Sequence, residues 1–226
     1  MSRRRSSDRT NESGFTLMEL MVVLSIIAVL LVLVSPTLWK MFGKGEVNRE
    51  KAVIQQIRVA VQSLQVDAAH GDLPPTFLDA VDSPYADEKG VMPNRTNTGI
   101  ESLVAIFESK DFRGQSPFTD EDRFINADED SSKKSITRFG SRDLFEYVDG
   151  WGTPYVYLRL RDFEEGKKRL TVSEVIGEDE YDEVDISPRK NERLGTYYGH
   201  SDGFQILSAG PDKRFDTDDD LASYEP

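Results

Sequence analysis

The chain has 226 residues, 38% of them hydrophobic, which is enough for one medium-sized core and one further apolar segment. It carries a net charge of −13 and has no cysteine. The lack of cysteine excludes disulfides, lipoprotein anchoring, thiolate zinc sites and thiol catalysis, and the acidic balance argues against a surface that binds nucleic acid.

The first 14 residues form a short basic leader, MSRRRSSDRTNESG, with four arginines against one aspartate and one glutamate. Because the whole chain carries −13 and the leader +2, the remaining residues carry −15. Lysine and arginine beside a membrane span favour the cytoplasmic side. We therefore expect residues 1–14 in the cytoplasm and the residues after the span on the outer side.

An apolar segment follows over residues 15–39, and Glu19 is its only charged residue. As a helix that rises ~1.5 Å per residue, this segment is longer than the ~30 Å hydrocarbon layer of a bilayer. It is therefore predicted to cross the membrane once. A secretory signal fits poorly, because valines precede Pro36 where small residues are expected. A plain signal anchor gives no reason for a charge that costs up to ~2.5–3.5 kcal/mol at the bilayer centre.

The stretch GFTLMEL, residues 14–20, resembles the class III signal of type IV pilins and type II secretion pseudopilins. The resemblance implies that a prepilin peptidase cuts after Gly14 and methylates the new amino terminus at Phe15. A buried glutamate is tolerable where a neighbouring subunit presents a positive amine to it, so Glu19 would be an assembly residue. Pro36 falls where the family commonly has proline, and a helix can loosen there when subunits pack.

The helix is expected to continue to about Ala69, because His70-Gly71 and Pro74-Pro75 supply a stop. Its second half carries an apolar stripe with spacings of three, four or seven residues, which indicates that this face covers a sheet. The residues of the stripe are Val47, Ile54, Ile57, Val61, Leu64 and Ala68.

Residues 76–149 are polar, with a small helix predicted after Thr98-Gly99 and a solvated loop over Asp120–Lys134. The clearest strand is WGTPYVYLRLR at Trp151–Arg161, where residue types alternate. Further strands are expected at 169–176 and 203–208, with the acidic run 178–185 between them.

The sequence DGWGTPY at 149–155 is similar to the strand entry of major pseudopilins, with Gly150 and Thr153 as departures from that pattern. Trp151 is predicted to be a core or corner residue and not a ligand contact. Neither His70 nor His200 has acidic or thiol partners at the spacing of a metal site or a catalytic triad.

The C-terminal stretch SAGPDKRFDTDDDLASYEP gathers aspartates within nine residues: Asp212, Asp216, Asp218, Asp219 and Asp220. Crowded carboxylates repel one another unless a cation neutralises them, and a loop of oxygen donors without histidine or cysteine suits Ca²⁺. On charge pattern alone, a solvated acidic tail is an equal alternative. The spacing lacks the glycine and the distal glutamate of an EF-hand.

Resemblance to the major pseudopilins, whose C-terminal loop holds one calcium ion, favours the metal. The implied ligands are the side chains of Asp212, Asp218 and Asp220, with Asp216 or Asp219 as alternates, and the backbone carbonyl of Ala209. Residues 213–215, Lys-Arg-Phe, stand where that family usually has glycines. This departure leaves the path of the loop and the fourth side-chain ligand open.

The expected fold class is α+β and pilin-like, a long N-terminal helix packed on a small antiparallel sheet with a C-terminal calcium loop. The expected segments are a cytoplasmic leader at 1–14, a transmembrane and assembly helix at 15–39, an amphipathic second half of the helix at 40–75, and a periplasmic globular domain at 76–226.

The resemblance implies a structural subunit, nearest to the major pseudopilin, that polymerises into a type II secretion pseudopilus and drives export of folded proteins across the outer membrane. Implied partners are further copies of the chain, other pseudopilins, the prepilin peptidase, the inner-membrane secretion platform and membrane lipid, with no nucleic acid. The chain would cross the bacterial inner membrane once, with its N-terminus in the cytoplasm and its C-terminal domain in the periplasm.

Two other interpretations stay open at this point. The first is a type IV pilin or minor pilin that serves adhesion, twitching or DNA uptake, although a disulfide-bonded C-terminal loop would favour that class and the chain has no cysteine. The second is a membrane-anchored, calcium-dependent binding module that never polymerises. No phosphate loop, dinucleotide fingerprint or serine-hydrolase motif is present, so we expect no enzyme.

Overall fold

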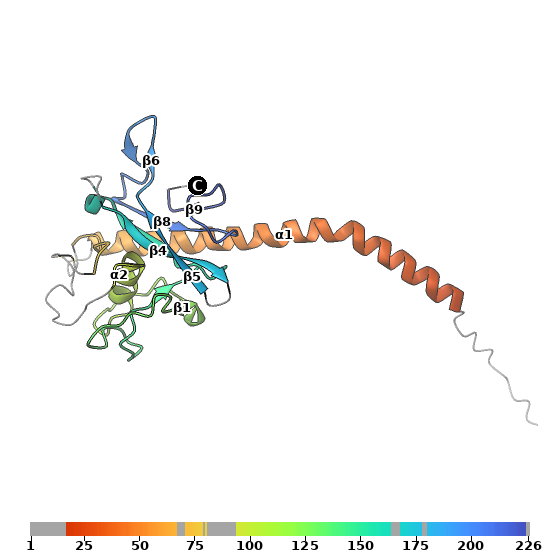
Figure 1. Ribbon diagram of the computed structural model, residues 1–226, viewed down its shortest axis with the longest axis horizontal. Helices are drawn as coiled ribbons and strands as arrows, with labels where there is room; N and C mark the ends of the chain where they lie inside the picture. Colours follow the sequence, from red (N-terminus) through yellow and green to blue (C-terminus); the bar gives the residue numbers. More distant parts are fainter. Residues whose placement is uncertain are drawn as a thin grey trace, which may run out of the picture. The chain divides into compact units, whose positions relative to one another are not determined.

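The computed structural model describes residues 17–66, 71–78, 80, 94–163, 168–177 and 180–224, with the backbone alone described for 32–42. The chain divides into two compact units, Met1–Gly45 and Glu46–Pro226. The described part of the first unit is helical, and the second unit contains all the described strands (Figure 1). The end of the N-terminal helix therefore belongs to the globular unit from Glu46 onward.

The elements in chain order are α1 (Leu17–Val66), α2 (Thr98–Phe107), η1 (Glu121–Arg123), β1 (Phe124–Ile125), β2 (Glu146–Tyr147), β3 (Val156–Arg159), η2 (Leu160–Phe163), β4 (Leu170–Gly177), β5 (Glu180–Ile186), β6 (Lys190–Asn191), β7 (Thr196–Tyr197), β8 (Phe204–Ser208) and β9 (Leu221–Ala222). Every strand pair is antiparallel. A helix followed by antiparallel sheets confirms the α+β class and is consistent with a pilin-like fold.

Helix α1 runs from Leu17 to Val66, and both expected ends, Phe15 and Ala69, lie outside the described residues. The predicted stripe is buried in the last turns of α1, where Ile54, Ile57, Val61 and Leu64 pack in one cluster with the side chains of β3 and β8. The prediction that this stripe covers a sheet is thus confirmed.

The central sheet has the strand order β3-β8-β9. Tyr157 and Phe204 point into the cluster under α1, whereas Val156 and Leu158 belong to a second cluster formed with the β4–β5 hairpin. The alternation along β3 therefore separates two buried faces, because helix and hairpin cover the sheet from opposite sides. Even Arg159 is buried there, paired with Asp162.

Helix α2 confirms the small helix predicted after Thr98-Gly99, and each of its ten residues is buried. A Cβ at Gly99 would overlap the backbone carbonyl oxygen of Tyr157. Glycine is therefore required for α2 to lie this close to β3.

Two expectations about connections are wrong. The acidic run 178–185 was expected to separate strands, but most of it forms β5, because Val184 and Ile186 pack on the second core while the acidic side chains stay near solvent. The stretch 120–134, expected to be a solvated loop, contains η1 and β1 and buries Asp130. Its high charge count obscured Phe124, which packs among the aromatic rings of the core.

Candidate functional site: N-terminal helix and C-terminal loop

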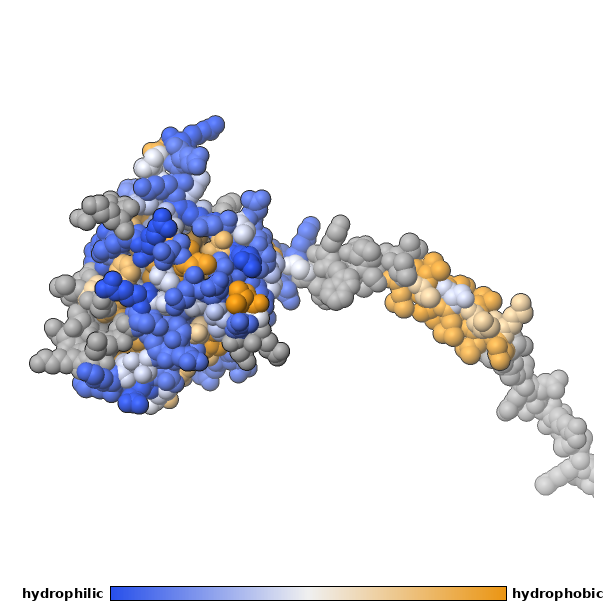
Figure 2. Space-filling view, in the orientation of Figure 1, coloured by the Kyte–Doolittle hydropathy of each residue, from blue (hydrophilic) through white to orange (hydrophobic). Residues whose placement is uncertain are grey.

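The first turns of α1 place Glu19 among exposed apolar side chains. Leu17 and Met18 are each 77% exposed, and the large apolar residues from Leu20 to Leu31 are exposed as well. Figure 2 shows this apolar surface on the described turns of the helix. A helix that is hydrophobic all round is stable when lipid or other helices surround it.

Several predicted residues of this segment are only partly covered by the structure. Gly14 and Phe15 lie outside the described residues, and Pro36 lies inside the helical range of α1 while its side chain is not among those described. Within the part of the chain that the structure describes, no helix is both long and apolar enough to cross a membrane.

The C-terminal loop connects β8 to β9, which pair directly through Leu207↔Ala222 and Ser208↔Leu221. Gly210 has a φ of 72°, and a Cβ at this position would overlap the backbone carbonyl oxygen of Asp219. Lys213 and Asp216 each have a φ of 63°. The loop thus folds back tightly on itself, which only a glycine permits at its base.

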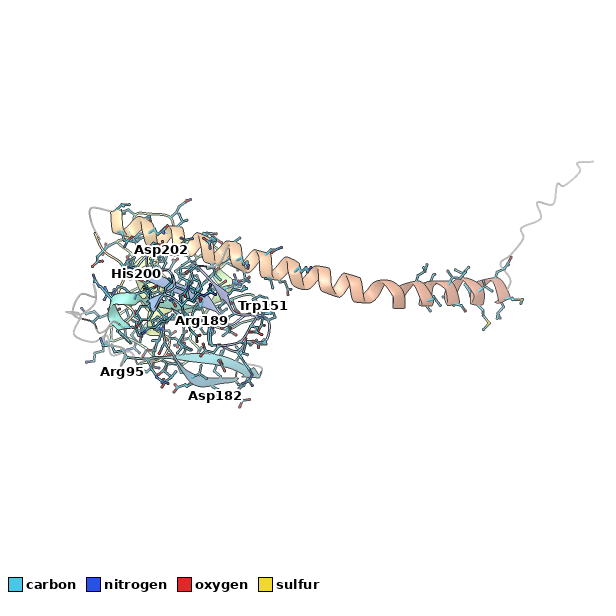
Figure 3. The ribbon with its side chains drawn as sticks, turned by 90° about the horizontal axis from the view of Figure 1, so that it is seen from above. Arg95, Trp151, Asp182, Arg189, His200 and Asp202 are labelled. Atoms are coloured by element: carbon cyan, nitrogen blue, oxygen red, sulfur yellow. The ribbon has the colours of Figure 1, made fainter. Side chains whose placement is uncertain are left out.

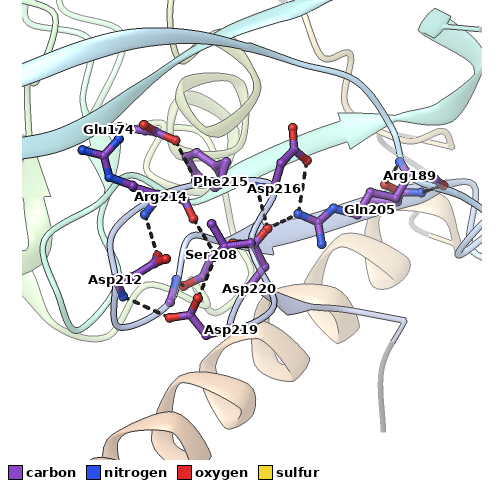
Figure 4. Close-up of polar contacts among 12 residues, drawn as sticks. Glu174, Arg189, Gln205, Ser208, Asp212, Arg214, Phe215, Asp216, Asp219 and Asp220 are labelled. Carbon is purple, nitrogen blue, oxygen red and sulfur yellow. Dashed lines mark hydrogen bonds and ion pairs between the residues drawn. The ribbon is translucent and has the colours of Figure 1, made fainter.

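Of the five predicted aspartates, Asp220 alone is buried, and its carboxylate forms an ion pair with Arg189 (Figure 4). The same carboxylate accepts a hydrogen bond from the backbone N–H of Asp216 at 2.9 Å. Arg189 also lies 3.4 Å from the Asp216 carboxylate. A guanidinium therefore neutralises the centre of the loop in this structure.

The remaining carboxylates of the loop accept local hydrogen bonds. Asp219 accepts from the backbone N–H of Asp212 at 3.0 Å and from the Thr217 hydroxyl at 2.7 Å. The Asp212 carboxylate accepts from the backbone N–H of Arg214 at 2.9 Å. Asp218 is exposed.

Phe215 explains how the loop departs from the glycine-rich pattern of the major pseudopilins. Its ring is buried in the second core, and its backbone N–H donates to the Glu174 carboxylate of β4 at 2.6 Å. The side chain anchors the loop to the hairpin, so a glycine there would remove a structural contact.

The structure brings Asp216 together with Asp220, and Asp212 together with Asp219, but it does not bring the implied ligands Asp212, Asp218 and Asp220 into one triad. Among the described residues, the C-terminal aspartates do not place three carboxylate oxygens within 4.8 Å of one another. The carbonyl of Ala209 belongs to a fully buried residue at the loop's start. Calcium at this loop stays a prediction, and in this structure Asp220 is already paired with Arg189.

Sequence reasoning missed Arg189, which lies between β5 and β6, and Glu174, which lies in β4, because neither belongs to a motif and both contact the loop only through the tertiary fold. It also missed a group of carboxylates, formed by Glu101, Asp128 and Glu146, whose oxygens do lie within 4.8 Å of one another. The signals available were a single charge in the apolar sequence TGIESLVAIF of α2 and the alternating oxygen donors of Asn126-Ala127-Asp128-Glu129-Asp130.

The histidines form no site in the described structure. His70 lies outside the described residues, and His200 is exposed in a turn. Figure 3 labels His200 and the nearby Asp202. Asp202 pairs with Arg58 of α1 at 2.7 Å and so ties the turn before β8 to the helix.

The comparisons with known proteins bear on the N-terminus. Residues 9–35 match a family model described as the prokaryotic N-terminal methylation motif. The match supports a type IV pilin-like or pseudopilin family, which implies a membrane-anchored N-terminal helix, processing by a prepilin peptidase and self-polymerisation. It is a motif of structural subunits and not of an enzyme family. No curated protein and no solved structure matches the chain in the other two comparisons.

Proposed function

We propose that this chain is a structural subunit of a type II secretion pseudopilus. Its helix anchors it once in the bacterial inner membrane, with the leader in the cytoplasm and the globular unit in the periplasm. After the prepilin peptidase cuts at Gly14 and methylates Phe15, the helices pack together with those of other subunits on the inner-membrane secretion platform. Growth of the filament pushes folded proteins through the outer membrane.

The observation that carries the proposal is the match of residues 9–35, which contains the leader junction and Glu19 together. An exposed apolar helix with one carboxylate near its start suits a filament core, where lipid is exchanged for neighbouring helices. The choice of secretion over a type IV pilus rests on two weaker points, the absence of cysteine and the DGWG strand entry.

Replacing Glu19 tests the assembly role. Glu19→Ala removes a charge from an apolar helix, so membrane insertion and cleavage to an N-methylated Phe15 should continue, as intact mass can verify. Filament formation and secretion should fall to background, because the amine of the neighbouring subunit loses its partner. The measurement is pseudopilus formation and exoprotein export in a strain that lacks the native gene.

Ser25→Ala is the matched control, since the Ser25 hydroxyl donates a hydrogen bond to the carbonyl of Met21 within the same helix, at 2.8 Å. This variant should assemble and secrete normally. Normal filament formation by Glu19→Ala would contradict the assembly role, and lost filaments with a defect in twitching but intact secretion would favour the type IV pilus. An uncut leader, or cleavage after Ser35, would remove the class III assignment.

We also propose that the C-terminal loop binds one Ca²⁺ in competition with Arg189. With a dissociation constant of about 10 μM, about 1 mM calcium stabilises the fold by roughly 2.7 kcal/mol through mass action. Asp212→Ala or Asp218→Ala should remove one bound ion per chain in a calcium titration and leave calcium-free stability nearly unchanged, because both side chains are exposed.

The Arg189→Gln variant tests whether Arg189 and Ca²⁺ compete for the carboxylates of the loop. It removes the positive charge beside Asp220, so calcium should bind this loop more tightly in the variant than in the native chain. An acidic tail without a site would respond weakly and equally to magnesium, and no single aspartate would matter. That pattern would exclude a calcium loop at the C-terminus.

A further inference from the structure

Three carboxylates from separate segments converge inside the globular unit, and we call them the acidic cluster. Glu101 comes from α2, Asp128 from the turn after β1, and Glu146 from β2. One oxygen of each lies within 4.8 Å of the others. The cluster lies apart in sequence from the C-terminal aspartates and shares no residue with them.

Glu101 is the observation that points to a ligand. Its side chain is 1% exposed, and neither carboxylate oxygen has a hydrogen-bond partner. One buried oxygen of Asp128 and one of Asp130 also lack a partner. A buried carboxylate without a donor is among the most unfavourable arrangements in a protein interior, so something must neutralise this group.

The described part of the chain offers no basic side chain for that purpose, since none of its ion pairs includes Glu101, Asp128, Asp130 or Glu146. Burial, together with repulsion from the neighbouring acids, raises the pKa of Glu101 well above its usual range. Burial likewise raises the pKa of Glu146 to about 8. Either protons or a cation must therefore occupy the cluster.

The surrounding structure holds these groups in place. Glu146 accepts hydrogen bonds from the backbone N–H of Ala127 at 3.0 Å and from the side-chain amide of Asn97 at 2.9 Å. Asn126 and Asp130 exchange side-chain-to-backbone hydrogen bonds at 2.8 and 3.1 Å, which closes the turn that carries Asp128. Because these donors fix Glu146 and the turn while Glu101 has no donor, the Glu101 oxygens are the ones left for an added ligand.

The chemistry of the donors selects the ion. All donors are carboxylate oxygens, without histidine or cysteine, which favours a hard cation over zinc, copper or iron. Ca²⁺ binds oxygens at about 2.3–2.6 Å, so two ligands on opposite sides of one ion lie roughly 4.8 Å apart. The three carboxylate oxygens of the cluster lie within 4.8 Å of one another, so one Ca²⁺ ion can contact all three. Mg²⁺ needs a tighter octahedron and keeps most of its water, which suits a largely buried cluster less well.

We propose that Glu101, Asp128 and Glu146 bind a Ca²⁺ ion, with Asp130 as a further oxygen donor, and that this ion clamps α2 to the β1–β2 segment. The ion satisfies the unpartnered oxygens and offsets the repulsion among the acids. It also joins segments that are far apart in the sequence, in a chain that has no disulfide to do so.

The test is a calcium titration of the full-length protein in detergent, stripped with chelator and followed by competition with a fluorescent calcium indicator. Native protein should bind calcium with a dissociation constant in the micromolar range, and calcium should raise its melting temperature by several degrees while an equal concentration of magnesium does not. Glu101→Gln and Asp128→Asn should each weaken this binding by at least tenfold.

The variants also separate a metal site from a merely protonated cluster. Glu101→Gln removes the unpartnered charge, so its calcium-free melting temperature should equal or exceed that of the native protein, while it binds one calcium ion fewer and loses the part of the calcium response that comes from the acidic cluster. Asp111→Asn, which changes an exposed acid, and Asp212→Ala in the C-terminal loop should keep the response of the cluster.

Three results would overturn the proposal. The first is native protein that binds no calcium at millimolar concentration. The second is calcium binding that survives both Glu101→Gln and Asp128→Asn but is lost in Asp212→Ala. The third is an equal response to magnesium. If Glu101→Gln fails to fold, Asp128→Asn decides alone, because Asp128 lies in a turn and not within a buried helix.

Discussion

Replacing Glu50 with alanine should lower the free energy of unfolding by about 3–5 kcal/mol, because it leaves buried donors without their acceptor. Glu50 is 2% exposed and accepts two hydrogen bonds of 2.8 Å from Arg123 and a further one from the Tyr155 hydroxyl. The three residues come from α1, η1 and the entry to β3. Their loss would separate the helix from the sheet it covers.

Glu50→Gln distinguishes lost charge from lost shape. The amide keeps one acceptor oxygen but directs its NH₂ group toward the guanidinium of Arg123, so we expect a loss of about 1.5–3 kcal/mol. Glu46→Ala, one turn earlier on the same helix and exposed, should stay within about 0.5 kcal/mol of the native protein. Urea unfolding measures all three, and a loss below about 1 kcal/mol for Glu50→Ala would contradict the role.

Glu50 also illustrates how far the sequence could predict the fold. Val47, Glu50, Ile54 and Ile57 follow the three-and-four spacing of the apolar stripe, so the burial of Glu50 could have been inferred from its position alone. The partners of Glu50 could not be inferred, because Arg123 lies 73 residues away in a stretch that was expected to be a solvated loop. Periodicity identifies the face of an element, whereas long-range polar pairs depend on the tertiary fold.

The same limit explains the predictions that were wrong. Residues 178–185 are too acidic to resemble a strand. In the hairpin, however, β5 pairs with β4 from Glu180 to Ile186, and Val184 and Ile186 pack on the second core. Helix α2 and the stripe of α1 were predictable, since each shows a clear apolar pattern within one element. The N-terminal motif was predictable as well, because its chemistry lies in one contiguous segment.

The two proposed metal sites differ in how far their residues are spread along the sequence. The C-terminal aspartates attract attention because they are contiguous, and the structure gives the most buried of them, Asp220, an arginine partner. The acidic cluster could not be predicted from the sequence, because its members are spread over 46 positions, from Glu101 to Glu146. Contiguous charge is usually solvated, whereas isolated charge inside an apolar element must find a partner in the fold.

Asp149 should prove as important to stability as Glu50, because it joins the DGWG turn to the start of the C-terminal loop. Its carboxylate accepts hydrogen bonds from the backbone N–H groups of Trp151 and Thr153, both at 3.0 Å, and from the Ser208 hydroxyl at 2.7 Å. At pH 5, Asp149→Ala should lower the free energy of unfolding by about 3–5 kcal/mol, since three donors, two of them buried, lose their acceptor.

Asp149→Asn should keep most of these hydrogen bonds. It should also show how much the ionisation of Asp149 lowers the free energy of unfolding. Burial raises the pKa of Asp149 to about 6 from its ordinary 3.8, so the folded state holds this proton more tightly than the unfolded chain. The stabilising contribution is complete below pH 3.8 and is lost as the pH rises through 6, by about 3 kcal/mol in total. The asparagine variant cannot ionise. Relative to the native protein, it should therefore gain stability between pH 5 and pH 8 in urea unfolding, whereas a constant difference across that range would show that Asp149 is already ionised in the fold at pH 5.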